Sequence, residues 1–341
     1  MLFKFLIISI LSMAFTTVLM VPFLNFMYSL GIKRAWEGKK NIKNSFFRKF
    51  HGWKVGTPTG GGALVLLSIF IFSGLYYILT NFSINWTTAT LFITLLLFGL
   101  LGMYDDLIKT LLFKRTKFWG LRMKHKLILQ LIIGFVISYL LYYKAGITSV
   151  YLPWYPDGIR LMLAPSVAII IYTLAIVGSA NAFNITDGLD GLMTGMFLIS
   201  SLFLWIIIGT LKIPGDVELV LAVTVGALIP FLYFNIYPAR VWVGDTGSMS
   251  LGSLMAVLFI MSDSLFAFPF VALVFVIVAF SSIFQMFTKK FLLKKYMKIA
   301  PIHFHFQAMG WDETKVVMRF WLFSVATGLT GLAIALIGRA Y

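Results

Sequence analysis

The chain has no cysteine and few charged residues, and both absences narrow its function. None of its 341 residues is cysteine, which excludes disulfide bonds, thiolate metal sites and cysteine nucleophiles. Charged residues make up only 12% of the chain, whereas a soluble domain has roughly a quarter. Hydrophobic residues make up 60%. This composition excludes a soluble enzyme and predicts a protein embedded in a membrane.

Apolar runs long enough to cross a bilayer as helices, about 20 residues each, recur along the whole chain. The first run is too long for a signal peptide and should remain as a helix. The run at 248–262 is short, unless residues 241–247 also lie at membrane depth inside a cavity. The expected fold class is an all-α integral membrane protein, with residues 1–341 as a single polytopic domain. About ten transmembrane helices are expected, near residues 5–32, 61–82, 88–104, 127–143, 162–183, 192–211, 218–236, 248–262, 264–288 and 316–338.

Basic residues are concentrated in alternate loops. The chain has 28 Lys and Arg against 12 Asp and Glu, a formal net charge of +16. Most of the basic residues fall within 33–54, 109–126 and 289–315, while the intervening loops hold only Lys144, Arg160 and Lys212. Because loops rich in Lys and Arg stay in the cytoplasm, we expect these three loops there and both termini outside. The positive charge is explained first by cytoplasmic loops and second by a polyanionic ligand. Nucleic acid is the least favoured of the three explanations.

The same topology places five aspartates at the cytoplasmic face: Asp105, Asp106, Asp187, Asp190 and Asp245. Carboxylates at a lipid boundary are costly unless they are solvated, paired or bound to a metal. A transporter or channel would hold such residues near the bilayer midplane, so their position at one face favours an enzyme site there. Four other acidic residues fall outside, among ordinary loop residues: Asp157, Asp216, Glu218 and Asp263.

Two polar strings each allow a structural and a functional interpretation. The string at 51–62 contains Lys54, Thr57 and three consecutive glycines. Its backbone amides could face an anion, or its small residues could pack against neighbouring helices. The second string is Asp105-Asp106-Leu-Ile-Lys109. Its adjacent carboxylates cannot share one helical face, so one could meet a metal or an acidic proton while the other points to a neighbour; a helix-end charge cluster is the alternative.

Three further strings carry polar side chains between apolar flanks. Residues 181–191 hold a polar residue at every third position, which a helical turn would align: Asn181, Asn184, Asp187 and Asp190. Residues 235–248 supply Asn235, Trp242, Asp245 and Ser248. The serine could cap the next helix, and the tryptophan taken alone is more typical of a membrane interface. His303 and His305 lack a third strong ligand for zinc, so hydrogen bonding to phosphate is the better role.

In order and spacing, these strings resemble the polyprenyl-phosphate hexose-1-phosphate transferases. The resemblance covers essentially the whole chain, through residues 54–62, 105–109, 120–130, 181–192, 243–252, 300–306 and 310–317. The chain departs from the family at Phe304 and Gln307, in a loop that usually has three successive histidines followed by Phe-Glu, and at Trp242, which is usually Phe. The Thr-Pro-Thr-Gly-Gly string and the Pro-Ile-His loop favour the branch that uses UDP-N-acetylmuramoyl-pentapeptide. The alternative is an N-acetylglucosamine-1-phosphate transferase of the same fold.

The resemblance implies a multi-pass enzyme of the bacterial cytoplasmic (inner) membrane, with its active site at the cytoplasmic face. Its substrates would be UDP-N-acetylmuramoyl-pentapeptide and undecaprenyl phosphate, its cofactor Mg²⁺, and its products lipid I and UMP. Its partners would be these substrates and the lipid bilayer, and a homodimer is left open. Phosphoryl transfer of this kind needs alignment and charge neutralisation more than covalent protein chemistry.

The resemblance also assigns roles to individual residues. Asp245 would bind the metal, with Asp187 as a second candidate ligand, and Asp105 or Asp106 would deprotonate or orient the lipid phosphate. Lys126, His303 and His305 would hold the diphosphate. The other candidate substrate-binding residues are Lys54, Thr57, Lys109, Asn181, Asn184, Asp187, Asp190, Asn235 and Trp242.

Overall fold

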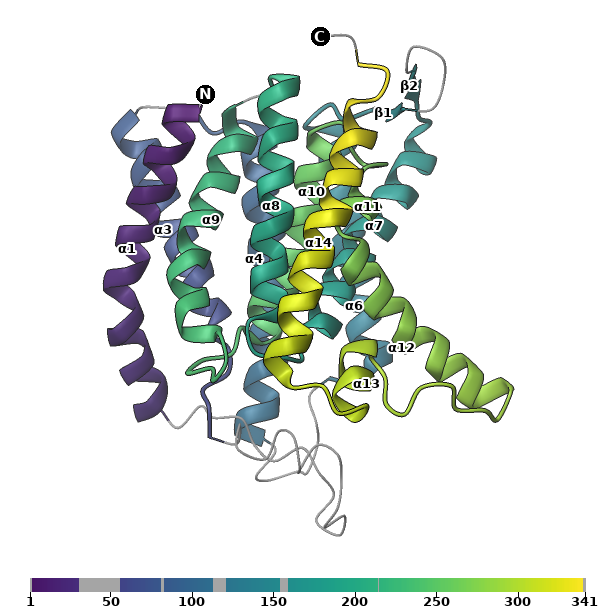
Figure 1. Cartoon of the computed structure of the whole chain (residues 1–341). Helices are drawn as coiled ribbons and strands as arrows, with labels where there is room; N and C mark the ends of the chain where they lie inside the picture. Colours follow the sequence, from purple (N-terminus) through teal and green to yellow (C-terminus); the bar gives the residue numbers. More distant parts are fainter. Residues whose placement is uncertain are drawn as a thin grey trace.

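The computed structural model describes residues 2–30, 56–80, 83–112, 121–153, 159–213 and 215–339. Within these ranges, ten helices are long and apolar enough to cross a membrane, and Figure 1 shows most of them packed side by side along one common direction. The ten predicted spans are therefore confirmed in number and approximate place. These helices are α1 (Leu2–Ser29), α3 (Gly62–Thr80), α4 (Trp86–Leu107), α6 (Met123–Tyr143), α7 (Pro165–Thr186), α8 (Leu192–Leu211), α9 (Gly215–Asn235), α10 (Gly244–Met261), α12 (Leu273–Phe291) and α14 (Glu313–Leu336).

Short elements join these helices, and one of them is a β-hairpin that the sequence did not predict in this mostly helical chain. Strands β1 (Ser149–Leu152) and β2 (Ile159–Met162) form an antiparallel hairpin between α6 and α7. The apolar run that we expected to open a helix at residue 162 instead ends a strand there, and Pro165 starts the helix, a position that proline favours. The remaining short elements are the π-helical turn η2 (Ile108–Leu112), α11 (Phe268–Val271) and α13 (Ile302–Ala308).

The hairpin is tied to the C-terminal end of α14. The Tyr151 hydroxyl donates to the Ile337 carbonyl at 2.8 Å, and the guanidinium of Arg339 lies 3.9 Å from the Tyr151 ring centroid. Asp263 accepts from Arg160 at 3.0 Å and lies 3.7 Å from Arg339, so it is not the ordinary loop residue that we expected. Burial lowers the pKa of Arg339, and the neighbouring carboxylate and phenol oppose that shift.

Helix α10 lies at the centre of the bundle, and its composition follows from that position. It is the least hydrophobic and the most buried of the ten helices, because its neighbours are other helices rather than lipid. Small residues let those helices approach closely. Gly247 of α10 lies against Gly62 of α3, and Ser179 of α7 donates to the Gly252 carbonyl at 2.6 Å. The helix begins at Gly244, so the span that looked short in sequence is extended as far as residue 244.

The predicted span at 264–288 is divided. Helix α11 ends at Val271, α12 starts at Leu273, and α12 leans away from the other helices toward its C-terminal end, as Figure 1 shows. That half of α12 therefore exposes large apolar side chains that elsewhere would pack in a bundle: Phe280, Ile283, Phe284, Met286, Phe287 and Phe291.

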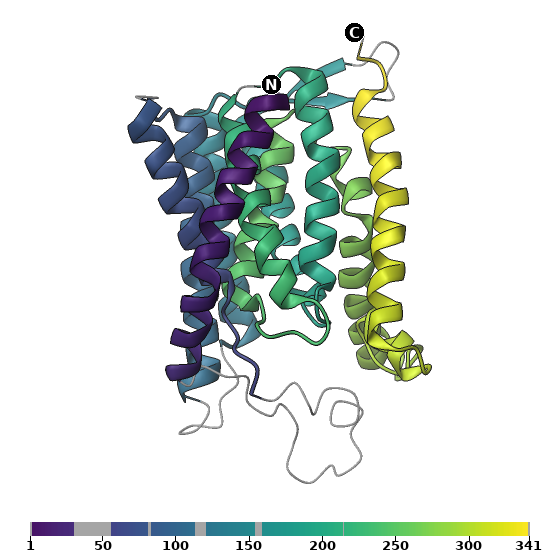
Figure 2. The same cartoon turned by 60° about the vertical axis from the view of Figure 1, so that its left-hand side comes forward.

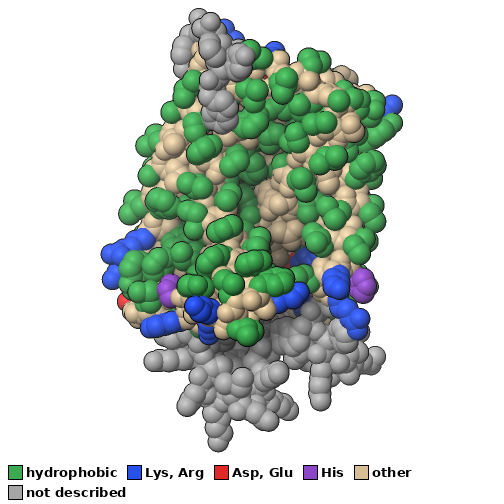
Figure 3. All heavy atoms as spheres, turned by 90° about the vertical axis from the view of Figure 1, so that its right-hand side faces the viewer, with side chains coloured by type: hydrophobic (Ala, Val, Ile, Leu, Met, Phe, Trp, Pro, Cys, Tyr) green, Lys and Arg blue, Asp and Glu red, His purple; other side chains and the backbone are tan. Residues whose placement is uncertain are grey.

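Candidate functional residues gather at one end of the bundle. Figure 2 shows both chain termini at the opposite end, and the turn between α7 and α8, the start of α10 and helix α13 lie far from them. Figure 3 shows Lys and Arg side chains concentrated at the functional end of the visible face. The structure thus brings the acidic strings and many of the basic residues to the same end, while the assignment of that end to the cytoplasm stays a prediction.

Cysteine labelling can test this orientation directly, because the chain has no cysteine of its own. Ser83 and Met309 are exposed, and they lie in the loop between α3 and α4 and just after α13, respectively. In intact cells, we expect a membrane-impermeant maleimide to label Ser83→Cys and to label Met309→Cys only after permeabilisation. Labelling of Met309→Cys in intact cells would reverse the proposed orientation.

Candidate active site

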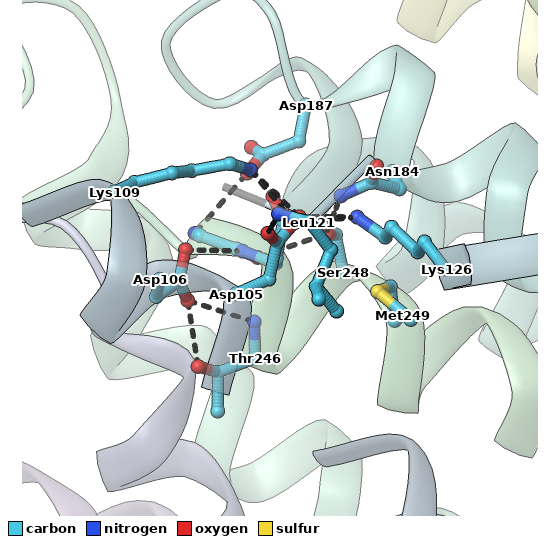
Figure 4. Close-up of polar contacts among 12 residues, drawn as sticks. Asp105, Asp106, Lys109, Leu121, Lys126, Asn184, Asp187, Thr246, Ser248 and Met249 are labelled. Carbon is cyan, nitrogen blue, oxygen red and sulfur yellow. Dashed lines mark hydrogen bonds and ion pairs between the residues drawn. The ribbon is translucent and has the colours of Figure 1, made fainter. Parts of the chain in front are cut away.

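Two aspartates and two lysines from four elements form the centre of the candidate site (Figure 4). The Nζ atom of Lys109 lies 2.8 Å from Asp245 Oδ2 and 3.1 Å from Asp105 Oδ2. The Nζ atom of Lys126 lies 3.0 Å from the same oxygen of Asp105 and also pairs with Asp245 Oδ2. Each lysine therefore bridges both carboxylates, and the four charges balance. We call these four residues the charge square.

Local structure explains how the charge square forms. Asp105 and Lys109 are four residues apart, which places them on one face where α4 runs into η2. Lys126 lies in the first turn of α6, and Asp245 lies in the first turn of α10, where the helix dipole favours a negative charge. The other oxygen of Asp105 accepts from the Leu121 amide at 2.7 Å. Lys109 is the most exposed member, at 34%, and Asp105 the least, at 2%.

Asp106 has different neighbours from Asp105, because adjacent residues cannot share one face of a helix. Its Oδ1 accepts from the Asp245 amide at 3.0 Å, and its Oδ2 accepts from the amide and the hydroxyl of Thr246 at 2.9 and 2.6 Å. Asp106 thus caps the N-terminus of α10 from another helix. The prediction that Ser248 caps this helix is wrong, because Ser248 lies inside α10 and donates to the Gly244 carbonyl. The Asp106 contact could not be found by sequence, since its partners are 139 and 140 residues away.

The glycine string supports α10 through its backbone. The Gly61 and Gly62 amides donate to the carbonyls of Trp242 and Val243, both at 2.8 Å, and the Trp242 amide donates to the Pro58 carbonyl at 2.9 Å. These two glycine amides are therefore not available to an anion, and the packing interpretation holds for them. Gly244 needs its missing side chain: its φ is +74°, and a Cβ there would lie 2.7 Å from Asp106 Oδ2.

The polar ladder of residues 181–190 is divided by the end of α7 at Thr186. Asn181 donates to Gln130 at 2.8 Å, and Asn184 donates to the Ser248 hydroxyl at 3.0 Å. Asp187 follows the helix and accepts from the Gly244 amide at 3.2 Å, which places its carboxylate at the N-terminus of α10. Asn184 and Asp187 therefore both contact the start of α10, next to the charge square.

Asp190 and Asn235 form hydrogen bonds with the loop between α9 and α10 and are not part of the charge square. Asp190 is 1% exposed; its carboxylate accepts from the Ala239 amide at 3.0 Å, and its own amide donates to Glu313 at 2.8 Å. The Asn235 amide group donates to the Val241 carbonyl and accepts from Thr194. These contacts fix the path of the chain from α9 into α10. Glu313 was absent from our candidates, although it lies in a segment that carried the family resemblance.

Comparison with known proteins identifies the family. Residues 86–263 match the model of glycosyl transferase family 4. A Campylobacter jejuni phospho-N-acetylmuramoyl-pentapeptide-transferase is 34% identical over 317 residues, which cover 88% of each chain. The enzyme of the same description from Clostridioides difficile is 36% identical over 278 residues, 81% of this chain and 82% of the relative. The one from Staphylococcus saprophyticus is 37% identical over 285 residues, 83% and 86% of the two chains. The chain belongs to the phospho-N-acetylmuramoyl-pentapeptide transferases.

In this transferase, the two candidate histidines lie in different surroundings. His303 is fully buried in α13, and a Cβ added to Gly188 would lie 2.6 Å from its Nε2 atom, so its ring packs on the turn that follows Asp187. The Nδ1 atom of His305 accepts from the Lys298 amide at 3.1 Å, away from that turn. Residues two apart on a helix do not share a face, so the structure does not support a joint role for the pair. Thr57 is half-buried beside the glycine string, and Lys54 lies outside the described residues.

The carboxylates of this transferase fit a metal that is shared with a substrate. Mg²⁺ usually takes one or two protein carboxylates and completes its coordination with water and phosphate oxygens. Asp245 and Asp187 both reach the N-terminus of α10, in its first turn and at the Gly244 amide, respectively. Among the described residues, no group of three or more His, Asp or Glu could hold a metal with protein ligands alone. Asp245 and Asp187 are therefore the carboxylates that could hold Mg²⁺ together with a substrate phosphate, and the metal stays a prediction.

Trp242 is 4% exposed. It therefore neither faces lipid, as a residue of the membrane interface would, nor offers an open indole face on which the uracil of a UDP-sugar could stack. We therefore expect Trp242→Ala to lower the free energy of unfolding by about 3–5 kcal/mol, because it opens a cavity in a packed region. Trp242→Phe should be milder. Thermal unfolding in detergent checks this; an unchanged melting temperature in the alanine variant, with a raised KM for the nucleotide, would instead support stacking.

Proposed function

We propose that this transferase moves phospho-N-acetylmuramoyl-pentapeptide from UDP to undecaprenyl phosphate. An oxygen of the lipid phosphate forms a bond to the sugar-linked phosphorus, the bond between that phosphorus and UMP breaks, and lipid I and UMP are the products. The observation that carries this proposal is the charge square at one end of a membrane bundle, in a chain whose relatives are described by this activity. Such an end can meet a lipid phosphate and a soluble nucleotide together.

The lysines and carboxylates suit different parts of this reaction. Lys109 and Lys126 can neutralise the diphosphate as negative charge moves to the departing UMP. Asp105 holds both ammonium groups in place, and its remaining role would be to orient or deprotonate the lipid phosphate. Asp106 is a weaker candidate for that role, because its two oxygens already accept three hydrogen bonds.

Mg²⁺ is part of this proposal, with Asp245 as its ligand and Asp187 as the second candidate. The bound ion would supply charge neutralisation on the diphosphate. Asn184 donates to Ser248 in the first turns of α10 and would help to hold this side of the candidate site. We further propose that the site lies at the cytoplasmic face of the bacterial inner membrane, because Lys and Arg residues are concentrated at this end of the bundle.

Release of UMP by purified protein tests the proposal. The protein in detergent is given undecaprenyl phosphate, Mg²⁺ and one UDP-sugar at a time. We expect UMP with UDP-N-acetylmuramoyl-pentapeptide, none without the lipid phosphate, and none with EDTA until Mg²⁺ is restored. If UMP is released from UDP-N-acetylglucosamine but not from UDP-N-acetylmuramoyl-pentapeptide, the protein is instead an N-acetylglucosamine-1-phosphate transferase. Full activity after metal removal would remove Mg²⁺ from the site.

A further inference from the structure

A second polar site lies at the opposite end of the bundle from the charge square. A cavity of about 120 Å³ opens there between α1, α3 and α9. Its lining includes Lys4 and Phe5 of α1, Tyr76 of α3, and Asp216 and Glu218 of α9. Figure 1 shows the start of α1 at this end, and α4 separates the cavity from the charge square by its full length, about 33 Å for 22 residues. The proposed transfer reaction does not use these residues.

The two carboxylates of this cavity are buried, and one oxygen of each has no hydrogen-bond partner among the described residues. Asp216 is 4% exposed and Glu218 is 8% exposed, which corrects the expectation that they are ordinary loop residues. One oxygen of Asp216 accepts from the Asn85 side chain at 2.5 Å, and Glu218 accepts from the Trp205 indole. Asp216 Oδ1 and Glu218 Oε1 have no hydrogen-bond partner among the described residues. Buried carboxylate oxygens without donors are costly, so this cavity calls for a ligand with several donors.

The rest of the cavity restricts what that ligand can be. A primary ammonium group carries positive charge and three N–H donors, enough to satisfy both free oxygens. A cavity of this volume holds a few heavy atoms, which excludes a sugar or a nucleotide. Lys4 on its lining can pair with an anionic group attached to the ammonium. A small zwitterion with its ammonium inside and its anion at Lys4, which also acts electrostatically on Glu218, would meet these requirements.

The position of the cavity points to a membrane lipid as the source of this zwitterion. It lies at the ends of membrane-spanning helices, at the level where lipid head groups are found. Beside it, α1 exposes apolar side chains of the kind that face acyl chains, Phe3, Leu6 and Ile7. We propose that this cavity binds the head group of an aminophospholipid of the phosphatidylethanolamine type, with its ammonium between Asp216 and Glu218 and its phosphate at Lys4.

N-methylation of the lipid tests the proposal on the unaltered protein. Phosphatidylethanolamine, its N,N-dimethyl derivative and phosphatidylcholine have the same phosphate but successively fewer N–H donors. Their binding to the delipidated protein can be compared by native mass spectrometry. We expect phosphatidylethanolamine to bind at least about tenfold more tightly than phosphatidylcholine, with the dimethyl lipid between them. The methylated lipids bind more weakly because they lose N–H donors, and with them hydrogen bonds to the charged carboxylates. Equal binding of the three lipids would overturn the proposal.

Isosteric variants locate the preference in this cavity. Asp216→Asn and Glu218→Gln keep the oxygens that accept from Asn85 and Trp205 but remove the negative charges. We expect each to reduce the preference for phosphatidylethanolamine to about twofold or less, while Asp312→Asn, the same kind of change at an exposed residue at the other end, leaves it unchanged. A preference that survives both cavity variants would place the lipid elsewhere and overturn the proposal.

Two soluble probes test whether the cavity binds a lipid rather than a soluble head group or a simple cation. Glycerophosphoethanolamine carries the same head group without acyl chains, and Na⁺ carries the charge without N–H donors. We expect neither probe, at millimolar concentration, to compete with phosphatidylethanolamine, because both lack the apolar contacts beside α1. Displacement of the lipid by Na⁺ would show a simple cation site and overturn the proposal, and displacement by the soluble head group would overturn its assignment to a lipid.

Discussion

Asp245→Asn is expected to lower the rate of UMP release by about 10³-fold or more, the scale seen when one charge-stabilising group is removed from a phosphoryl-transfer site. An amide keeps the shape of the side chain but loses the charge that the proposed Mg²⁺ would require and that pairs with Lys109 and Lys126. The rate is measured with both substrates saturating, across a range of Mg²⁺ concentrations.

The control for this variant is Asp312→Asn, which makes the same chemical change at an exposed residue just before α14. It should release UMP at the wild-type rate. The melting temperature of both variants in detergent separates a loss of chemistry from a loss of folding. A folded Asp245→Asn variant with near wild-type turnover at saturating Mg²⁺ would remove Asp245 from the site.

Gly102→Ala should also be severely damaging, although it adds only one methyl group. A Cβ at Gly102 of α4 would overlap the backbone carbonyl of Asp245 and lie 2.6 Å from the Thr246 amide, and backbone atoms cannot rotate out of the way. We expect α10 to shift at its N-terminus, which lowers the free energy of unfolding by about 1–3 kcal/mol. Displacement of Asp245 by even 1 Å should cost about 10²-fold in rate.

Gly74→Ala is the matched control, since a Cβ at this position in α3 meets nothing within 4 Å. Alanine favours a helix over glycine by about 1 kcal/mol, so this variant should be as stable as the wild type or more so, with normal activity. The two variants differ only in what the added methyl group meets. If Gly102→Ala behaves like Gly74→Ala in thermal unfolding and UMP release, α4 and α10 do not pack as closely as described.

The membrane helices could be predicted from sequence because lipid imposes a simple requirement of length and apolarity. The errors occur where neighbours other than lipid decide the structure. The apolar run that predicted helix α10 was short for a membrane span, because the glycines and serines of this helix suit contact with other helices rather than with lipid. The hairpin between α6 and α7 was missed because a run of four residues per strand carries little periodic signal.

The sequence predicted several of the residues that the structure brings together at the candidate site, but not the contacts that they make. Lys109, Lys126, Asp105 and Asp245 were all expected, yet nothing local reveals that two lysines bridge two aspartates from distant helices. For the same reason, nothing in the sequence reveals that Asp106, which stays a catalytic candidate, also caps α10. Long-range contacts of this kind set the roles, and a sequence pattern describes only local spacing.

The balance of the charge square restricts how this protein can change during evolution. Neutralising one member leaves an uncompensated charge beside Asp105, which is 2% exposed, and breaking a buried pair in this way costs about 3–5 kcal/mol. That is a large part of an ordinary folding stability of about 5–15 kcal/mol. Replacing one lysine and one aspartate together restores neutrality and avoids most of that loss. Single replacements at these four positions should therefore be selected against for the stability of the fold as well as for catalysis.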